Sequence, residues 1–133
     1  MVQLASKNKV FSDLDLDFDI HPNTKQLVMK TGDAAVVQSV KNLIATNHYE
    51  RPFHPEKGCG IRNSLFENVQ PSTAKSIANW IEEVIRNYEP RVRIDDLEVI
   101  AKPEENGYNV TLRMFIINEA ISRTVNLFLE RIR

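Results

Sequence analysis

Two stretches of the chain carry apolar residues at the spacing of an amphipathic helix. The first runs from Asp33, a suitable N-cap residue, to about Thr46. The second begins at Pro71, because the first helical position has no intrahelical use for an N–H group. Pro90 ends it, since the residue before a proline is pushed away from helical geometry. The two stripes are Val36, Val37, Val40, Leu43 and Ile44, and then Ala74, Ile77, Ala78, Ile81, Val84, Ile85 and Tyr88.

Beyond Pro90 the pattern changes to the two-residue alternation of β-strands. Asn106-Gly107 predicts a hairpin turn of type I′, because both central residues of that turn need positive φ. A third strand is expected to follow and to end at Arg133. The apolar residues of the three strands are Leu97, Val99 and Ala101, then Tyr108, Val110, Leu112, Met114 and Ile116, and finally Val125, Leu127 and Leu129.

The first 32 residues are expected to be extended. Residues 25–30 favour a short strand that ends at Thr31-Gly32, and residues 47–60 form a loop rich in proline, glycine and histidine. Near the start, four acidic residues alternate with four apolar ones, which predicts an extended strip with one apolar face and one solvated acidic edge. The alternating residues are Asp13, Asp15, Asp17 and Asp19 with Leu14, Leu16, Phe18 and Ile20.

Together these elements predict an α+β fold in one domain, residues 1–133. An extended segment, 1–32, precedes a helical part, 33–90, and a part made of antiparallel strands, 91–133. The two main amphipathic helices are expected to pack on one face of the antiparallel sheet, which has a C-terminal hairpin and an edge strand.

Charge and composition narrow the classes of partner. The chain has 17 basic and 18 acidic side chains, so it lacks the basic excess that nucleic-acid binders show. No apolar run approaches the roughly 18 residues that cross a bilayer, and the first residues lack the apolar core of a signal peptide. Cys59 is the single cysteine, which excludes an internal disulfide and favours a reducing compartment. We therefore expect protein partners, with no nucleic acid, membrane or small-molecule substrate, and assembly in a cytoplasm.

No metal, cofactor or catalytic site is expected. A calcium loop of the EF-hand type beginning at Asp13 would need glycine at position 18 and glutamate at position 24, where this chain has Phe18 and Thr24. His48, His54 and Cys59 match no compact zinc spacing. The glutamates include no pair whose positions single it out as the acid and base of a glycosidase; the candidates are Glu56, Glu67, Glu82, Glu83 and Glu89.

The segment Glu89-Pro90-Arg91 stands where the second helix gives way to a strand. Proline fixes φ and so holds the two charges at a defined angle. The planar fork of Arg91 suits a bidentate bond to a carboxylate, either in this chain or in a neighbouring subunit. The alternative is a helix terminator with two exposed charges.

Three segments closely resemble the baseplate wedge protein family of T-even-like contractile phages. They are Arg51-Pro-Phe-His-Pro-Glu-Lys-Gly58, Leu65-Phe-Glu-Asn68 and Arg86-Asn-Tyr-Glu-Pro-Arg91, and the likeness extends to Phe11-Ser-Asp-Leu-Asp15. The family includes sheath initiators of contractile phages and a component of type VI secretion baseplates, and it has long carried a tail-lysozyme label. The combination of the Arg-Pro-Phe loop with Glu-Pro-Arg is the specific part of this resemblance.

The resemblance implies a structural role in a virion's tail baseplate. Its expected partners are other wedge proteins, which the motif Glu89, Pro90 and Arg91 would help to hold together, and tail sheath subunits. Arg51 and Phe53 are expected to take part in the protein contacts. Peptidoglycan cleavage by a tail lysozyme, and the corresponding place in a type VI secretion machine, are the alternative functions.

The last predicted strand agrees with such a role. With no chain beyond Arg133 to cover it, its outer edge is expected to accept a strand from a sheath subunit. If Val125, Leu127 and Leu129 become buried on docking, each contributes about 1.5–3 kcal/mol before the entropy of association is subtracted. The alternative is an edge strand that only closes the protein's own core.

Overall fold

The computed structural model describes residues 11–15, 17–117 and 119–132. Leu16 of the predicted acidic strip and the predicted strand end at Arg133 therefore lie outside the described residues, as do the first ten positions. The chain divides into two units, Met1–Gln38 and Ser39–Arg133, and the boundary falls within helix α1 (Asp33–Ala45). Helix α1 starts at Asp33 itself, directly after Gly32, whose φ is 65°, so Asp33 is the first helical residue and not the N-cap predicted for it.

In the first unit, the expected extended strip is interrupted. Strand β1 (Ser12–Leu14) pairs antiparallel with β2 (Met29–Thr31). Among the described residues beyond these strands, the pairing continues as scattered backbone hydrogen bonds and the isolated bridge between Ile20 and Leu27. The side chain of Asp15 is one reason, because its Oδ1 accepts a hydrogen bond from the backbone N–H of Asp17 at 3.2 Å. Aspartate bonds of this local kind compete with a strand ladder.

The predicted solvated acidic edge is also corrected at one position. Asp15 is buried, and its Oδ1 lies 3.0 Å from Nζ of Lys30. On the apolar side the expectation fails too, because Phe18 and Ile20 are exposed. Sequence alternation alone therefore misplaced which side chains this unit covers.

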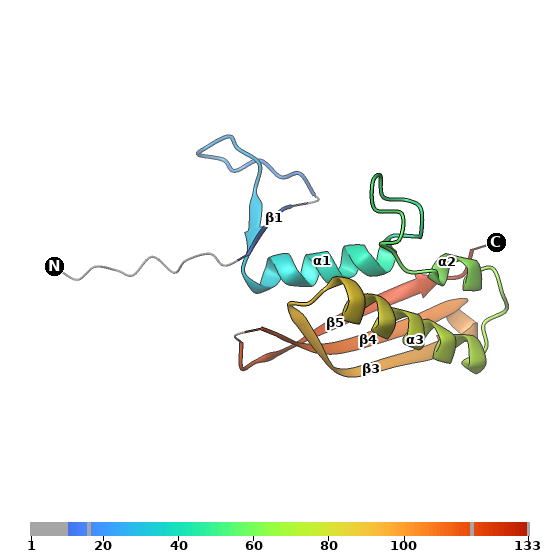
Figure 1. The fold of residues 1–133 in the computed structure, drawn as a ribbon. Helices are drawn as coiled ribbons and strands as arrows, with labels where there is room; N and C mark the ends of the chain where they lie inside the picture. Colours follow the sequence, from blue (N-terminus) through green and yellow to red (C-terminus); the bar gives the residue numbers. More distant parts are fainter. Residues whose placement is uncertain (1–10, 16, 118, 133) are drawn as a thin grey trace. The chain divides into compact units, whose positions relative to one another are not determined.

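The second unit is built on a three-stranded antiparallel sheet in the order β3 (Val92–Lys102), β4 (Gly107–Ile116) and β5 (Ser122–Glu130). Helix α3 (Pro71–Tyr88) covers one face of this sheet, as Figure 1 shows, and the short helix α2 (Ile61–Ser64) contacts α3. Two main helices with antiparallel strands confirm the predicted α+β class. The first unit adds a second, two-stranded sheet that the sequence pattern did not predict as such.

The core of the second unit lies between α3 and the sheet. The predicted face of the central strand is buried, and so is the predicted helical stripe except for Ala78 and Tyr88, which are half-buried. The two clearest periodic patterns of the chain are therefore confirmed. The fully buried side chains from these two elements include Ile77, Ile81 and Ile85 of α3 and Tyr108, Val110, Leu112 and Met114 of β4. No helix in the described part of the chain is both long enough and apolar enough to cross a membrane.

The turn between β3 and β4 differs from the predicted two-residue hairpin. A 3₁₀ turn, Pro103–Glu105, follows β3, and Asn106 alone adopts the left-handed conformation, with φ of 56°. Gly107 is instead the first residue of β4, and close packing there leaves no room for a side chain. A Cβ at this position would lie 2.6 Å from the carbonyl oxygen of Leu129 and 2.5 Å from Cζ of Phe128.

We therefore expect Gly107→Ala to lower the free energy of unfolding by about 1–3 kcal/mol, because a backbone oxygen cannot move away without disturbing the pairing of β4 with β5. Urea denaturation followed by circular dichroism measures the change. Gly60→Ala is the matched control, since its new Cβ would come no closer than 3.4 Å to the His48 side chain. Equal stability of the two variants would contradict the packing argument.

Candidate protein-interaction site

Local backbone bonding places the Glu89-Pro90-Arg91 corner between α3 and β3. The N–H of Glu89 donates to the carbonyl oxygen of Ile85 at 2.9 Å and so completes the last turn of α3. The N–H of Val92 donates to the carbonyl oxygen of Glu89 at 3.2 Å, and β3 starts there. Pro90 has no N–H to continue the helix, so the chain changes direction within these few residues.

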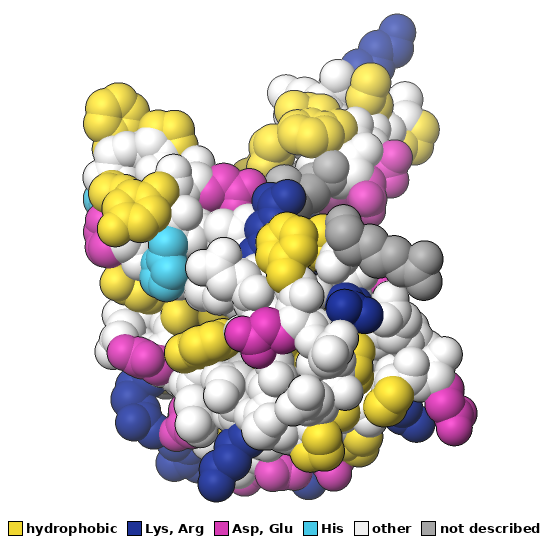
Figure 2. Space-filling model, turned by 90° about the vertical axis from the view of Figure 1, so that its right-hand side faces the viewer, with side chains coloured by type: hydrophobic (Ala, Val, Ile, Leu, Met, Phe, Trp, Pro, Cys, Tyr) yellow, Lys and Arg dark blue, Asp and Glu magenta, His cyan; other side chains and the backbone are white. Residues whose placement is uncertain are grey.

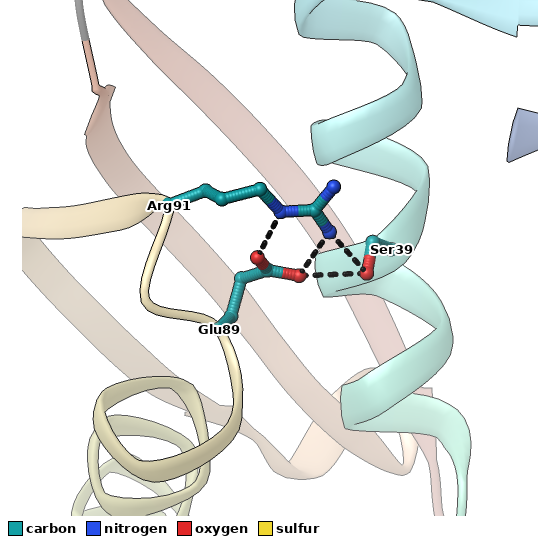
Figure 3. A network of polar contacts seen from close by, with 3 residues as sticks. All are labelled: Ser39, Glu89 and Arg91. Atoms are coloured by element: carbon teal, nitrogen blue, oxygen red, sulfur yellow. Dashed lines mark hydrogen bonds and ion pairs between the residues drawn. The ribbon is translucent and has the colours of Figure 1, made fainter. Parts of the chain in front are cut away.

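Glu89, Arg91 and Ser39 form one polar network, which Figure 3 shows from close by. Arg91 donates two hydrogen bonds to the carboxylate, from Nε to Oε1 at 2.6 Å and from Nη2 to Oε2 at 2.8 Å. Ser39 Oγ donates to Oε2 at 2.7 Å and accepts from Nη2 of Arg91 at 3.2 Å. The bidentate bond left open by the sequence is thus made within this chain.

The network is buried on one side and open on the other. The Glu89 side chain is 3% exposed, whereas that of Arg91 is 33% exposed. Burial by itself raises the pKa of Glu89, but the hydrogen bonds from Arg91 and Ser39 and the charge of Arg91 outweigh it and hold the pKa below its ordinary value. The corner therefore presents a cation at the surface whose position a buried carboxylate fixes.

Arg51 and Phe53 lie in a different segment, residues 46–59, which we call the aromatic loop. Both side chains are exposed, Phe53 by 96%. Tyr49, in the same loop, is 86% exposed and was not among the residues selected from the sequence. An aromatic residue in a loop rich in proline and glycine was the signal that could have identified it.

The aromatic loop holds a backbone shape that its sequence does not favour. Tyr49 and Phe53 have φ values of 65° and 66°, a region that bulky side chains rarely adopt and that costs about 1–2 kcal/mol per residue. The loop is nevertheless closed at its base, where the N–H of Cys59 donates to the carbonyl oxygen of Thr46 at 2.7 Å. Gly58 makes this closure possible, because a Cβ there would lie 2.6 Å from the backbone of Asn47.

The three selected residues of β5 differ in burial. Val125 is 3% exposed and already belongs to the protein's own core, while Leu127 and Leu129 are half-buried. They share the face of the sheet that β4 uses for its buried residues, since Val125 pairs with Leu112 and Leu127 with Val110. The stabilisation expected from burying Val125 when a strand docks is therefore already present in the folded chain.

Cys59 has the properties of a core residue and not of a nucleophile. It is 1% exposed, and its burial raises the pKa of the thiol to about 12. A thiol in that state is protonated at neutral pH and unreactive. Within the described residues there is no group of three or more His, Cys, Asp or Glu side chains that could hold a metal ion.

Comparisons with known proteins agree on one family. Residues 30–125 match the model of the family described as baseplate wedge protein gp25. The chain is 37% identical over 117 residues to baseplate wedge protein gp25 of Enterobacteria phage T4, a match that covers 86% of each protein.

Two solved structures share the fold. One belongs to the baseplate of the anti-feeding prophage, with a TM-score of 0.71 and 25% identity over 83% of this chain and 88% of the other. The second is a Geobacter sulfurreducens protein proposed to be a tail lysozyme, with a TM-score of 0.65 and 20% identity over 78% of this chain and 96% of the other. At that identity the second likeness concerns the fold alone.

The polar network predicts a specific dependence of stability on pH. Because the pKa of Glu89 is lowered in the folded state, its contribution to the free energy of unfolding is complete above the ordinary value of 4.5 and is lost as the pH falls through the folded pKa. Glu89→Gln should cost about 1–3 kcal/mol at pH 7. It should also flatten the loss of stability below pH 4.5.

Urea unfolding of both proteins between pH 7 and pH 3 measures this difference. The pKa of the exposed Glu56 is also lowered, but Glu56 is present in both proteins, so its effect does not contribute to the difference between their stability curves. Parallel stability curves for the variant and the parent protein would show that the network does not hold the charge of Glu89.

Proposed function

This chain belongs to the baseplate wedge protein gp25 family, and we propose that it joins the inner core of a tail wedge and starts assembly of the sheath. As a member of the family it is a structural component of the baseplate of a contractile phage tail. The proposal adds two docking features to that role: the Glu89-Pro90-Arg91 corner for other wedge proteins, and the edge of β5 for a sheath subunit. Assembly in the host cytoplasm is part of the same proposal.

The single observation that carries the proposal is the Ser39–Glu89–Arg91 network. A guanidinium held by two bonds to a buried carboxylate loses little side-chain entropy when a partner carboxylate or carbonyl group approaches it. Its one-third exposure leaves surface for such an approach. The same network ties α1 to the corner between α3 and β3 through Ser39.

Strand docking is supported by the place of β5 in the sheet. The order is β3-β4-β5, and among the described residues no strand pairs with the side of β5 that faces away from β4. A strand added there would gain main-chain hydrogen bonds along up to nine residues, Ser122–Glu130. Leu127 and Leu129, which are half-buried, can still lose some exposed area on docking.

Peptidoglycan cleavage is the weaker function. A glycosidase acid needs a raised pKa, and the buried Glu89 has its pKa lowered by Arg91 and Ser39 despite the opposing effect of burial. Glu82 is engaged by Arg86 on the exposed face of α3. The match to the phage T4 protein favours a phage tail over the type VI secretion machine that the sequence motifs also allowed.

The corner is tested by Arg91→Lys. A lysine keeps the positive charge beside Glu89, so the chain should stay folded, but it cannot reproduce the bidentate fork. We expect the apparent affinity for the other wedge proteins of the same tail to fall about tenfold or more, a loss of about 1.4 kcal/mol or more. Co-expression followed by analytical ultracentrifugation measures wedge formation.

Arg86→Lys is the control for the corner, because Arg86 lies in the last turn of α3 and bonds Glu82 at the surface. It should leave wedge formation unchanged. The role of the corner would be refuted if both variants assembled as well as the parent chain. Removing the Arg91 side chain entirely is less informative, since it would leave the buried Glu89 charge with Ser39 as its remaining side-chain hydrogen bond.

The edge of β5 is tested by placing proline at two neighbouring positions, Asn126 and Leu127. Successive N–H groups of a strand point to opposite sides, so only one substitution removes a group that faces away from β4. That variant should keep its thermal transition and lose sheath nucleation, whereas the other should be destabilised by the broken ladder. Normal sheath growth, seen by electron microscopy, from the variant that remains folded would refute strand docking.

A further inference from the structure

We propose that the aromatic loop is a two-ring anchor that inserts Tyr49 and Phe53 into an apolar socket with an acidic rim on another baseplate subunit. This inference rests on the proposed function, because it assumes that the chain is built into a baseplate. It differs from the corner and the edge strand in the residues that it uses and in the chemistry of the partner.

The exposure of the two rings is the first argument. Tyr49 and Phe53 lie four residues apart and are the most exposed large hydrophobic side chains recorded for the described residues, at 86% and 96%. Figure 2 shows hydrophobic side chains exposed among acidic and basic ones on one face of the molecule. Single exposed hydrophobic residues are ordinary, but two nearly bare rings on one short loop are typical of an interaction site.

The loop is ordered before any partner arrives. The N–H of Tyr49 donates to the carbonyl oxygen of Pro55 at 2.8 Å, across the turn that carries Phe53. The N–H of Asn47 donates to Oε2 of Glu50 at 2.7 Å. These bonds fix the backbone below the rings, so an interaction with them loses less conformational entropy than one with a flexible loop.

The backbone conformation gives the second, independent argument. Both ring-bearing residues sit at positive φ, where asparagine or glycine would be the residue that suits the fold. The aromatic side chains contribute almost nothing to the chain's own core, because they are nearly fully exposed. Strain at residues without a packing role points to a function outside the fold.

Charge and area select the partner. Glu50 accepts hydrogen bonds from Asn47, and Glu56 lies 3.4 Å from Nδ1 of His54. Arg51, which lies between Tyr49 and Phe53 in the sequence, is exposed. A socket with carboxylates at its rim complements that arrangement.

The area of the two rings also limits the kind of contact. Each ring buries about 150–250 Å², which is less in total than the roughly 800 Å² per partner of a stable complex. The loop therefore fits one anchor of a larger interface better than a self-dimer.

The test replaces the rings with the residue that the backbone prefers. Tyr49→Asn and Phe53→Asn, singly and together, should leave the thermal transition unchanged or raise it, because the strain is relieved. The double variant should lose about tenfold or more in incorporation into the wedge when it is co-expressed with the other wedge proteins of the same tail. Phe66→Asn, an exposed aromatic outside the loop, should assemble normally. Normal assembly of the double variant would overturn the anchor.

The socket is tested separately with the full chain. Arg51→Glu should weaken incorporation in the same assay because it opposes an acidic rim. A photo-crosslinking phenylalanine analogue at position 53 should capture, in the assembled baseplate, a peptide of another subunit that is apolar and contains Asp or Glu. A crosslink to a second copy of this chain, or to a peptide without acidic residues, would overturn the proposed partner chemistry.

The outcomes separate the two proposals. If Arg91→Lys blocks wedge formation while the ring variants assemble normally, the anchor is wrong and the proposed function stands. If the ring variants fail while Arg91→Lys and the proline variant that stays folded behave as the parent chain, the anchor stands and the proposed docking features are wrong.

Discussion

The structure depends on one buried carboxylate. Glu89 caps the C-terminal end of α3, and its oxygens accept three hydrogen bonds: two from Arg91, just before β3, and one from Ser39 of α1, fifty residues earlier. A buried charge of this kind is costly unless each oxygen is hydrogen-bonded, so helix, strand and α1 must meet in one arrangement for the fold to be stable. The corner therefore sets the geometry of the second unit as well as the position of a surface cation.

The second unit separates the parts that stabilise it from the parts that are available to partners. Its buried core includes most of the stripe of α3, the inner face of β4 and Val125 of β5, together with Val40, Leu43 and Ile44 of α1. Tyr49 and Phe53 of the aromatic loop contribute little to that core, and their backbone is strained instead. A protein whose work is assembly gains from this separation, because surfaces can be shaped for partners without loosening the interior.

The sequence predicted those elements whose pattern is repeated over several turns or residues. The stripe from Ala74 to Tyr88 and the alternation from Tyr108 to Ile116 were both confirmed, because each buries most or all of an apolar face. Shorter signals were misleading. Asn106-Gly107 suggested a two-residue turn, but Gly107 is required by the close approach of Leu129 and not by positive φ.

The network around Glu89 shows a different limit of sequence analysis. The fork of Arg91 and the stiffening proline were apparent from the motif, but nothing in one sequence connects Ser39 with a residue fifty positions away. The sequence placed Tyr49 in a loop rich in proline and glycine, but its exposure and positive φ are properties of the folded loop. Long-range partners and strained conformations emerge only when the whole chain is packed.

These features together explain how a strand could dock in one register at β5. Because Val125 is already buried and its neighbours on that face are half-buried, the proposed docking edge offers mainly backbone groups and few side-chain pockets. Backbone pairing alone specifies register weakly, since a strand shifted by two residues makes the same bonds. The register of a docked sheath strand would therefore be set by rigid contacts elsewhere on the subunit, and the Arg91 corner and the aromatic loop are the two ordered features suited to fix it.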